Sequence, residues 1–408
     1  MEPSELFSSA AAYADFDGWH AAATKMRDSA AVHRMEPAGN TPFWAIMRHA
    51  EVMEVERHAE VFTNEPASTL MPERPDPFAE KEPAVVNTLI NMDGADHFAH
   101  RSLVADWFKP ASVSRLAGKI DELAARSVEE MAALGGECDF ASDIAMNFPL
   151  RVILSILGLP EEDFPRMLRL TQELFGGDDP DFTRAGEDQD VLSVIMDFIG
   201  YFTTLTANRR ANPTDDLASV IANGSINGVP LNDMDTFGYY LIAATAGHDT
   251  TSSAIAGGMH VLLQHPDQLE RIKQDPSLVD NAADEIVRWV TPVKHFMRTA
   301  RQDYTLGGTE IARGDWVLMS YPSANRDERV FADPFTFDVG RPEAHSHLGF
   351  GFGRHYCLGS QLARLEIRSI FRQLIPRLDR IELTGPAELM HSNLVSGPKR
   401  LPISYAMS

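Results

Sequence analysis

The sequence predicts a mainly α-helical chain with small β-sheets, folded as one domain over residues 1–408. Apolar residues recur at three-to-four spacing through most of residues 96–263, which is typical of packed helices. The pattern then changes to short alternating runs separated by glycines, which indicates strands joined by tight turns. No regular alternation of strands and helices supports a Rossmann or barrel fold, and no repeat or flexible linker marks a domain boundary.

The N-terminal part combines a strand, a helix and a loop. The run PFWAIMR at residues 42–48 has the composition of a short strand, and residues 49–58 follow with helical spacing. The proline-rich run at residues 68–85 interrupts both periods, so we expect an irregular loop there.

Two long helices are predicted in the middle of the chain. The segment at residues 112–134 has apolar residues at helical spacing and stops at Gly135 and Gly136. The segment at residues 232–265 is predicted to be one very long helix, with Asn232 or Asp233 as its N-cap and Pro266 beyond its end. Because this helix is apolar on nearly all faces, it is expected to run through the interior.

The C-terminal part carries the strands. DNAADEIVRWVTP at residues 280–292 predicts another helix, and the alternating run at residues 303–321 predicts strands with turns at its glycines. The last helix is expected to start near Cys357, and residues 388–405 are expected to form short strands.

Charge and cysteine content exclude several classes of protein. With 36 basic and 59 acidic residues, the net charge of −23 disfavours nucleic acid and anionic membranes as partners. Two cysteines, Cys138 and Cys357, cannot build a disulfide framework. The N-terminus has early acids and neither a basic region nor a long apolar run, so we expect no signal peptide or membrane anchor and a cytoplasmic location.

One cysteine lies in the glycine-rich run HLGFGFGRHYCLGSQLARLE at residues 347–366. Glycines allow the backbone to turn tightly and to approach a large flat ligand without Cβ clashes. The start of a helix is also expected to lower the thiol pKa of Cys357, which favours a thiolate that binds a metal or an electrophile.

Several alternatives exist for this cysteine. His345, His347, His355 and Cys357 offer four zinc ligands, although their spacing matches no usual zinc pattern. A nucleophilic pair of Cys357 and His355 lacks any sign of an oxyanion hole. The third alternative is a buried structural cysteine, the usual role of an isolated cysteine, and this is the interpretation we prefer for Cys138.

The fourth interpretation is an axial thiolate on haem iron. FGFGRHYCLG resembles the cytochrome P450 signature F-G-x-G-x-[RH]-x-C-x-G at each fixed position: Phe350, Gly351, Gly353, His355, Cys357 and Gly359. The resemblance implies the helix-rich, triangular P450 fold, haem b as cofactor and Cys357 as the iron ligand. In the family, thiolate ligation favours cleavage of the O–O bond of dioxygen.

Other motifs extend the resemblance along the chain. Glu285 and Arg288 match the family's E-x-x-R, a pair that braces the cysteine loop. The family often places a third arginine in D-P-x-R-F-D, where this chain has Thr336, so another group must complete the brace or it is absent.

AGHDTT at residues 246–251 resembles the family's [AG]-G-x-[DE]-T. The resemblance makes Asp249 and Thr250 the acid–alcohol pair that delivers protons during oxygen activation, with Gly247 leaving room for dioxygen. The alternative for Thr250 is a hydrogen bond to the carbonyl four residues earlier.

Haem also carries two propionates, which need partners when buried. DGADHFAHR resembles the family's D-P-P-E-H-x-x-x-R, so His97 and Arg101 are candidate partners. Arg298 and His355 match the family's other propionate contacts.

The resemblance is strongest to the soluble bacterial branch, and within it to the terpineol-oxidising group. This implies a monooxygenase that hydroxylates a small hydrophobic substrate such as a monoterpenoid, or a terpenoid or aromatic hydrocarbon of similar size. By their positions relative to the family motifs, seven residues are expected to line the substrate pocket, although each could equally belong to the hydrophobic core. They are Ile242, Thr245, Ala246, Val293, Phe296, Leu394 and Val395. The loop at residues 68–84 is expected to add contacts.

The branch usually takes electrons from a ferredoxin, a ferredoxin reductase and NAD(P)H. An acidic chain needs a local basic patch to dock an acidic donor. Arg364, Arg368 and Arg372 fall on one helix face, and Lys109 and Arg354 could join them, although a solvated helix face explains the spacing equally well. The alternatives to a ferredoxin-driven monooxygenase are a peroxide-driven peroxygenase and a non-catalytic haem-binding sensor.

Overall fold

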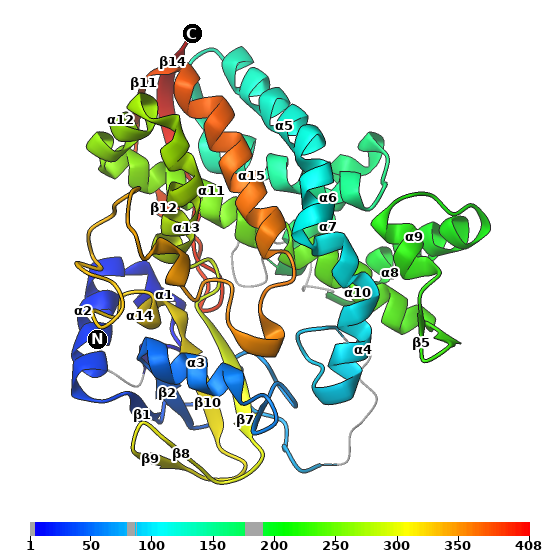
Figure 1. The fold of residues 1–408 in the computed structure, drawn as a ribbon, viewed down its shortest axis with the longest axis vertical. Helices are drawn as coiled ribbons and strands as arrows, with labels where there is room; N and C mark the ends of the chain where they lie inside the picture. Colours follow the sequence, from blue (N-terminus) through cyan, green and yellow to red (C-terminus); the bar gives the residue numbers. More distant parts are fainter. Residues whose placement is uncertain (1–4, 80–85, 87, 176–190) are drawn as a thin grey trace.

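The computed structural model describes residues 5–79, 86, 88–175 and 191–408. Its helices form one large part and its main sheet forms another (Figure 1). The α-helices are α1 (Ala10–Ala14), α2 (Phe16–Ser29), α3 (His49–Arg57), α4 (Gly94–Ala105), α5 (Pro110–Ala133), α6 (Asn147–Ile156), α7 (Phe164–Phe175), α8 (Val191–Ala211), α9 (Leu217–Ala222), α10 (Asp233–Ala246), α11 (Asp249–Gln264), α12 (Pro266–Gln274), α13 (Val279–Val290), α14 (Tyr321–Ala324) and α15 (Ser360–Leu374).

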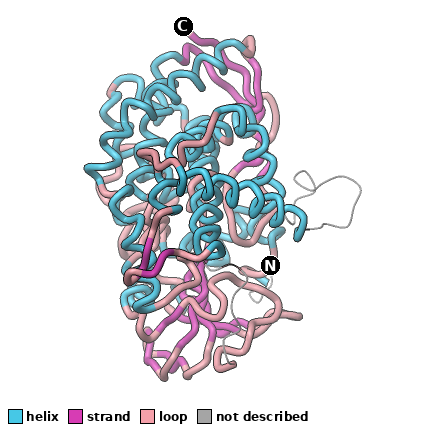
Figure 2. The backbone as a smooth tube through the Cα atoms, turned by 90° about the vertical axis from the view of Figure 1, so that its right-hand side faces the viewer, coloured by secondary structure: helices cyan, strands magenta, loops and turns pink. Residues whose placement is uncertain are grey.

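The two larger sheets lie near opposite ends of the molecule (Figure 2). The larger sheet has the order β1-β2-β10-β7-β3, from β1 (Val32–Met35), β2 (Phe43–Ile46), β10 (Trp316–Ser320), β7 (His295–Ala300) and β3 (Phe62–Thr63). A second sheet near the C-terminus orders β11 (Leu378–Leu383), β14 (Pro402–Met407) and β4 (Glu137–Asp139). Two-stranded ribbons are formed by β5 (Ser225–Ile226) with β6 (Val229–Pro230), β8 (Tyr304–Leu306) with β9 (Thr309–Ile311), and β12 (Glu388–Leu389) with β13 (Pro398–Arg400).

The local sequence explains where the long helices begin and end. Asn232 caps α10 by accepting a hydrogen bond from the backbone N–H of Asp235 at 2.8 Å, as predicted. α5 has a proline at its first turn and is followed by Gly135 and Gly136 at φ +83° and +103°, a backbone conformation that glycine adopts without strain. The predicted stop of this helix is therefore confirmed.

The prediction of one very long helix over residues 232–265 is wrong. α10 ends at Ala246 and α11 begins at Asp249. Side-chain hydroxyls compete for backbone carbonyls around the break: Thr245 donates to Leu241 O at 2.7 Å, and Thr250 donates to Ala246 O at 2.8 Å. Such bonds, together with Gly247, bend or interrupt a helix.

α11 lies in the interior, as expected from its apolar sequence. Most of its residues from Thr251 to Leu262 are buried, and it packs among α6, α13 and α15. Gly257 allows a close approach to α13, because a Cβ there would lie 2.6 Å from Val290 Cγ2. None of the described helices combines the length and the apolar character needed to cross a membrane.

A buried ion cluster joins α13 to the segment that precedes the cysteine loop. Glu285 and Arg288 are fully buried and form a bidentate pair, with Arg288 Nε donating to Glu285 Oε2 at 2.6 Å and Nη2 to Oε1 at 2.8 Å. Arg341 supplies the third group: its Nε donates to Glu285 Oε1 at 3.1 Å, and its guanidinium also bonds the carbonyls of Ala332, Asp333 and Thr336. The arginine missing at position 336 is thus replaced by one five residues later.

The cluster extends to the cysteine loop through Asn325. Arg288 Nη1 donates to Asn325 O at 2.9 Å, and the backbone N–H of Leu348 donates to Asn325 Oδ1 at 2.7 Å. In parallel, His347 contacts Asp284 of α13 at 3.2 Å. These contacts fix the start of the loop relative to α13.

Arg341→Leu is expected to destabilise the fold by about 3–5 kcal/mol, because it removes a charged partner from the buried Glu285 carboxylate and a hydrogen bond from each of three carbonyls. Arg271→Leu is the matched control, since Arg271 pairs with Asp338 at 2.7 Å in an exposed position and such a pair is worth about 0–1 kcal/mol. Denaturant unfolding of both variants measures the difference. If both variants lost the same free energy of unfolding, the buried cluster would not stabilise the fold more than an exposed ion pair does.

Candidate functional site

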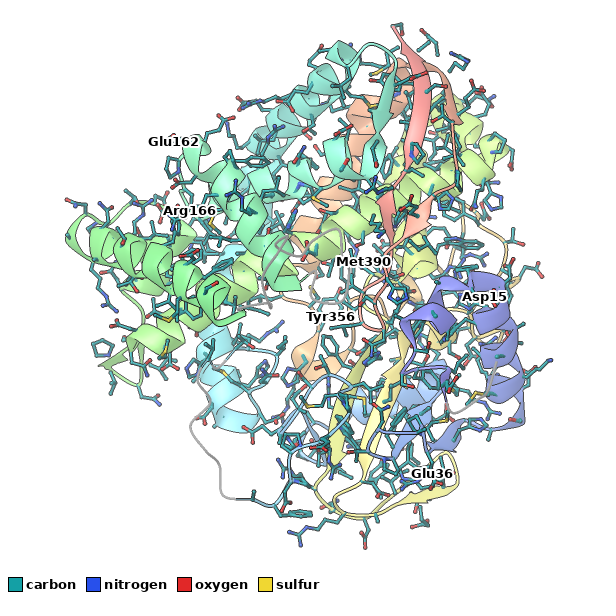
Figure 3. All side chains as sticks on the ribbon, turned by 180° about the vertical axis from the view of Figure 1, so that it is seen from behind. Asp15, Glu36, Glu162, Arg166, Tyr356 and Met390 are labelled. Carbon is teal, nitrogen blue, oxygen red and sulfur yellow. The ribbon has the colours of Figure 1, made fainter. Side chains whose placement is uncertain are left out.

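The loop that carries Cys357 lies between the sheet part and the helical part, and Figure 3 labels its neighbour Tyr356 near the middle of the molecule. Gly351 and Gly353 have φ of +66° and +69°. A Cβ at residue 353 would lie 2.4 Å from Glu56 O on α3. These glycines are therefore needed for the turn and for contact with α3, which differs from the expected approach to a ligand. A Cβ at Gly359 would meet no atom within 4 Å, so this glycine is not required by a close contact.

Cys357 is half-buried, and its backbone N–H donates to Phe350 O at 2.8 Å. Burial raises the pKa of its thiol, while backbone N–H groups of Gly359 and Ser360 and the Arg101 and Arg364 guanidinium groups act in the opposite direction. The N–H groups at the helix start do lower this pKa, as expected, but burial has the larger effect and the net shift is upward. A bound metal is the group that would hold such a sulfur as thiolate.

The zinc interpretation is contradicted in the described part of the chain. No three histidine, cysteine, aspartate or glutamate residues gather there as a metal site. His347 bonds Asp284, and His345 Nδ1 bonds Pro342 O at 3.1 Å. No hydrogen bond between described residues joins Cys357 to His355, which removes the geometric basis for a nucleophilic pair. Cys138 lies half-buried on β4, where burial raises its pKa to about 12, in keeping with a structural role.

The four candidate propionate partners come from two separate elements and the cysteine loop. His97 and Arg101 lie on α4, Arg298 on β7 and His355 in the cysteine loop. The rings of His97 and His355 are 4.0 Å apart. Arg101 Nη2 donates to Tyr356 O at 2.7 Å, which ties α4 to the residue before Cys357.

Burial and nearby guanidinium groups disfavour the charged form of both histidines. Desolvation, then Arg101, lowers the pKa of His97 to about 4, and desolvation, then Arg298, lowers the pKa of His355 to about 2. In the neutral form each ring can still donate a hydrogen bond to a propionate. Asn64 fixes one of them, because its Nδ2 donates to His355 Nε2 at 2.6 Å while Asp93 holds Asn64 at 2.9 Å.

The acid–alcohol candidates lie at the break between α10 and α11. Thr250 Oγ1 donates its proton to Ala246 O, the alternative noted for this residue, so its oxygen remains free to accept a hydrogen bond. Asp249 Oδ1 lies 3.1 Å from His248 Nδ1, and its Oδ2 is buried without a hydrogen-bond partner among the described residues. His248 Nε2 contacts Met146 O at 2.9 Å, which anchors the break to the segment before α6.

The structure explains the glycine at position 247 by a helix contact. A Cβ there would lie 2.6 Å from Ile153 Cδ1 of α6 and 2.9 Å from Ala243 O. The glycine thus permits α6 to approach the helix break. Its expected role beside dioxygen stays a prediction.

Six of the seven pocket candidates keep some exposure although they lie in interior segments. Val293 and Val395 form a bridge between two strand-like segments, and Lys294 N donates to Leu394 O at 2.8 Å beside it. Thr245 is the exception: it is 3 % exposed and its hydroxyl serves the backbone. The partly or fully exposed members are Ile242, Ala246, Val293, Phe296, Leu394 and Val395. Of the loop expected to add contacts, residues 80–84 lie outside the described residues.

The predicted basic helix face is largely neutralised by α13. Arg364 Nε bonds Asp284 Oδ1 at 2.6 Å and only 12 % of its side chain is exposed. Arg368 lies 3.4 Å from Asp280, and Arg372 bonds the same carboxylate. Lys109 is paired with Asp106 at 2.5 Å. Arg354 is exposed and makes no ion pair within the described ranges.

Sequence reasoning missed several residues of the site. Arg341 lies outside the family pattern, which has its arginine at the position of Thr336. His248 stood inside AGHDTT at the variable position. Asn64 and Asp93 gave no signal, since only the fold brings them to His355.

The residues present fit a haem with a thiolate ligand. The sulfur of Cys357 receives the backbone N–H groups of Gly359 and Ser360, which suits a thiolate. Arg298 is 3 % exposed yet has only Met297 O and a carboxylate at 3.8 Å as described partners, so its guanidinium has donors to spare for a propionate.

Comparisons with known proteins agree with this geometry. The family model for cytochrome P450 matches residues 38–403. Cytochrome P450-terp of a Pseudomonas species is 40 % identical, covering 96 % of this chain and 95 % of that protein. Steroid C26-monooxygenase of Mycolicibacterium smegmatis is 35 % identical over 93 % of this chain and 89 % of its own. Linalool 8-monooxygenase of Pseudomonas putida is 33 % identical over 93 % of each.

The fold is likewise shared. The crystal structure of CYP108D1 from Novosphingobium aromaticivorans superposes with a TM-score of 0.89 at 37 % identity, and covers all of both chains. The predicted fold class and haem cofactor are confirmed. The chain belongs to the cytochrome P450 family of haem-binding monooxygenases.

Proposed function

We propose that Cys357 is the iron ligand of a monooxygenase that hydroxylates a small apolar terpenoid with electrons from a ferredoxin. The observation that carries the proposal is the meeting of α4 with the cysteine loop: Arg101 Nη2 donates to Tyr356 O at 2.7 Å, and the rings of His97 and His355 lie 4.0 Å apart. Bound haem supplies the activation of dioxygen.

The chain's own residues have separate roles in this proposal. Arg101 and Arg298 neutralise the propionates, while His97 and His355 orient them by hydrogen bonds. Thr250 Oγ1 accepts a hydrogen bond from water near the reacting oxygen, and Asp249 passes protons to that water. The free Oδ2 of Asp249 supports this role, because it is the one oxygen of the carboxylate not facing His248.

The proposed substrate follows from the pocket candidates and from the relatives. The candidates with exposure are aliphatic or aromatic, so they suit a neutral hydrocarbon body and not a charged one. One relative is named for linalool and another for steroids, which are both largely apolar. The greater identity to cytochrome P450-terp favours the terpenoid.

Two further inferences accompany the proposal. Residues 1–408 form one domain, which is supported by a main sheet that combines β1, β2 and β3 with β7 and β10. Docking of the ferredoxin is assigned to Arg354 beside the cysteine loop, since Arg364, Arg368 and Arg372 are already paired.

Titration with monoterpene alcohols is expected to shift the ferric haem from low to high spin, because an apolar molecule displaces water from the site. Turnover with ferredoxin, reductase and NAD(P)H should then give hydroxylated product. A spin shift with a sterol alone would replace the terpenoid by a larger substrate. Product from hydrogen peroxide but not from ferredoxin would favour a peroxygenase, and binding without any product would favour a sensor.

Asp249→Asn is expected to lower the turnover rate by about 10²-fold, the smaller end of what a positioned acid or base contributes, and to increase the solvent isotope effect. Thr250→Val should keep NAD(P)H consumption but release more of the oxygen as hydrogen peroxide. Ser252→Ala is the control, because its hydroxyl bonds His248 O at 2.9 Å inside the core. Wild-type coupling in both site variants would exclude the pair from proton delivery.

A further inference from the structure

Glu56 is a buried acid that no motif pointed to. It lies near the end of α3, 5 % exposed, directly beneath the glycines of the cysteine loop. A Cβ at Gly351 would lie 3.1 Å from its Oε1, and the backbone N–H of Phe352 donates to its carboxyl. The acid therefore touches the loop that presents Cys357 to the haem.

The partners of Glu56 compensate its charge only in part. Tyr321 OH donates to Oε1 at 2.7 Å, and Arg298 Nη2 lies 3.8 Å from the same oxygen. Oε2 is buried without a partner among the described residues. Burial raises the pKa of Glu56 to about 7, against the opposing effects of Arg298, Tyr321 and Phe352.

Arg298 is the link between this acid and the haem. It is 3 % exposed, and the one described hydrogen bond of its side chain is from Nη1 to the adjacent Met297 O at 2.8 Å. Its position on β7 is fixed by the register in which it faces Val317 of β10. A guanidinium with Glu56 on one side and spare donors on the other can bind two carboxylates at once.

We propose that Glu56 is a positioning residue that holds Arg298 against a haem propionate and, through its charge, lowers the reduction potential of the haem. The inference rests on the proposed role of Arg298 as a propionate partner. Ionised Glu56 cancels the positive charge of Arg298, and a less positive surrounding favours the ferric over the ferrous state. Burial makes the effect strong, because little water screens the pair.

The pH dependence has a definite sign. The carboxyl is neutral below its raised pKa and charged above it, so the haem potential should fall as the pH rises through about 7. The titratable and charged groups that face it are Tyr321 from α14, Arg298 from β7 and, next to Arg298, His355 of the loop. Burial lowers the pKa of His355 to about 2 and raises the pKa of Tyr321 well above its usual value, so neither group titrates in this window.

Glu56→Gln keeps the shape and the acceptor for Tyr321 but removes the charge. Its haem potential at pH 8 is expected to shift to a more positive value, and the fall with pH near 7 should disappear. Glu56→Asp, which keeps the charge, should restore both. Glu60→Gln is the control, because it removes the same charge from an exposed site just after α3. Spectroelectrochemical titration measures all four proteins.

Tyr321→Phe keeps the inference testable if the glutamine variant does not fold. Loss of the hydroxyl raises the pKa of Glu56 further, so the potential at neutral pH should also become more positive. Unchanged potentials in Glu56→Gln, or in Tyr321→Phe where that variant is needed, would overturn the role of Glu56. Failure of the wild-type protein to bind haem would instead refute the proposed function, before any variant is compared.

Discussion

A buried cluster of one carboxylate and two arginines holds the loop on which the site depends. Glu285, Arg288 and Arg341 are each no more than 5 % exposed, and removing such charges from water is costly. The cost is offset because nearly every donor finds a carboxylate or a carbonyl, from Ala332 to Thr336 on one side and Asn325 on the other. Since Asn325 then holds Leu348, the position of the cysteine loop is set by this cluster.

The site combines a sulfur that is negative as a thiolate with two positively charged guanidinium groups. The sulfur of Cys357 lies at the start of α15 with backbone N–H groups directed at it, while Arg101 and Arg298 approach from α4 and β7. Arg101 serves both sides, because it bonds the residue before Cys357 and lowers the thiol pKa by its charge. The oxygen side is built from a broken helix, where hydroxyl groups replace regular backbone bonds and leave Asp249 and Thr250 partly exposed.

Local sequence predicted the parts of this structure that depend on short-range pattern. The cap at Asn232, the stop at Gly135 and Gly136 and the glycine turn around Cys357 are set by residues next to them. The break at Gly247 was missed, because apolar periodicity continues through it while the competing hydroxyl bonds do not appear in periodicity. Arg341 and Glu56 were missed because their partners lie 56 and more than 200 residues away and only the fold joins them.

The arginines of α15 show that the charge of a surface, too, cannot be predicted from local sequence alone. Their spacing of four residues was read correctly as one helix face, but the acids Asp280 and Asp284 that neutralise it belong to α13. A helix face can be predicted from its own sequence, whereas its net charge depends on the neighbour that packs against it.

The bond between the Cys357 sulfur and the haem iron is the claim on which the account rests. The most direct measurement is the carbon monoxide difference spectrum of the reduced protein, compared among wild type, Cys357→Ala and Cys138→Ala. The account predicts the red-shifted band of a thiolate-ligated haem in wild type and in Cys138→Ala, and its loss in Cys357→Ala. A thiolate-type band that survives in Cys357→Ala, or its absence from haem-loaded wild-type protein, would contradict the account.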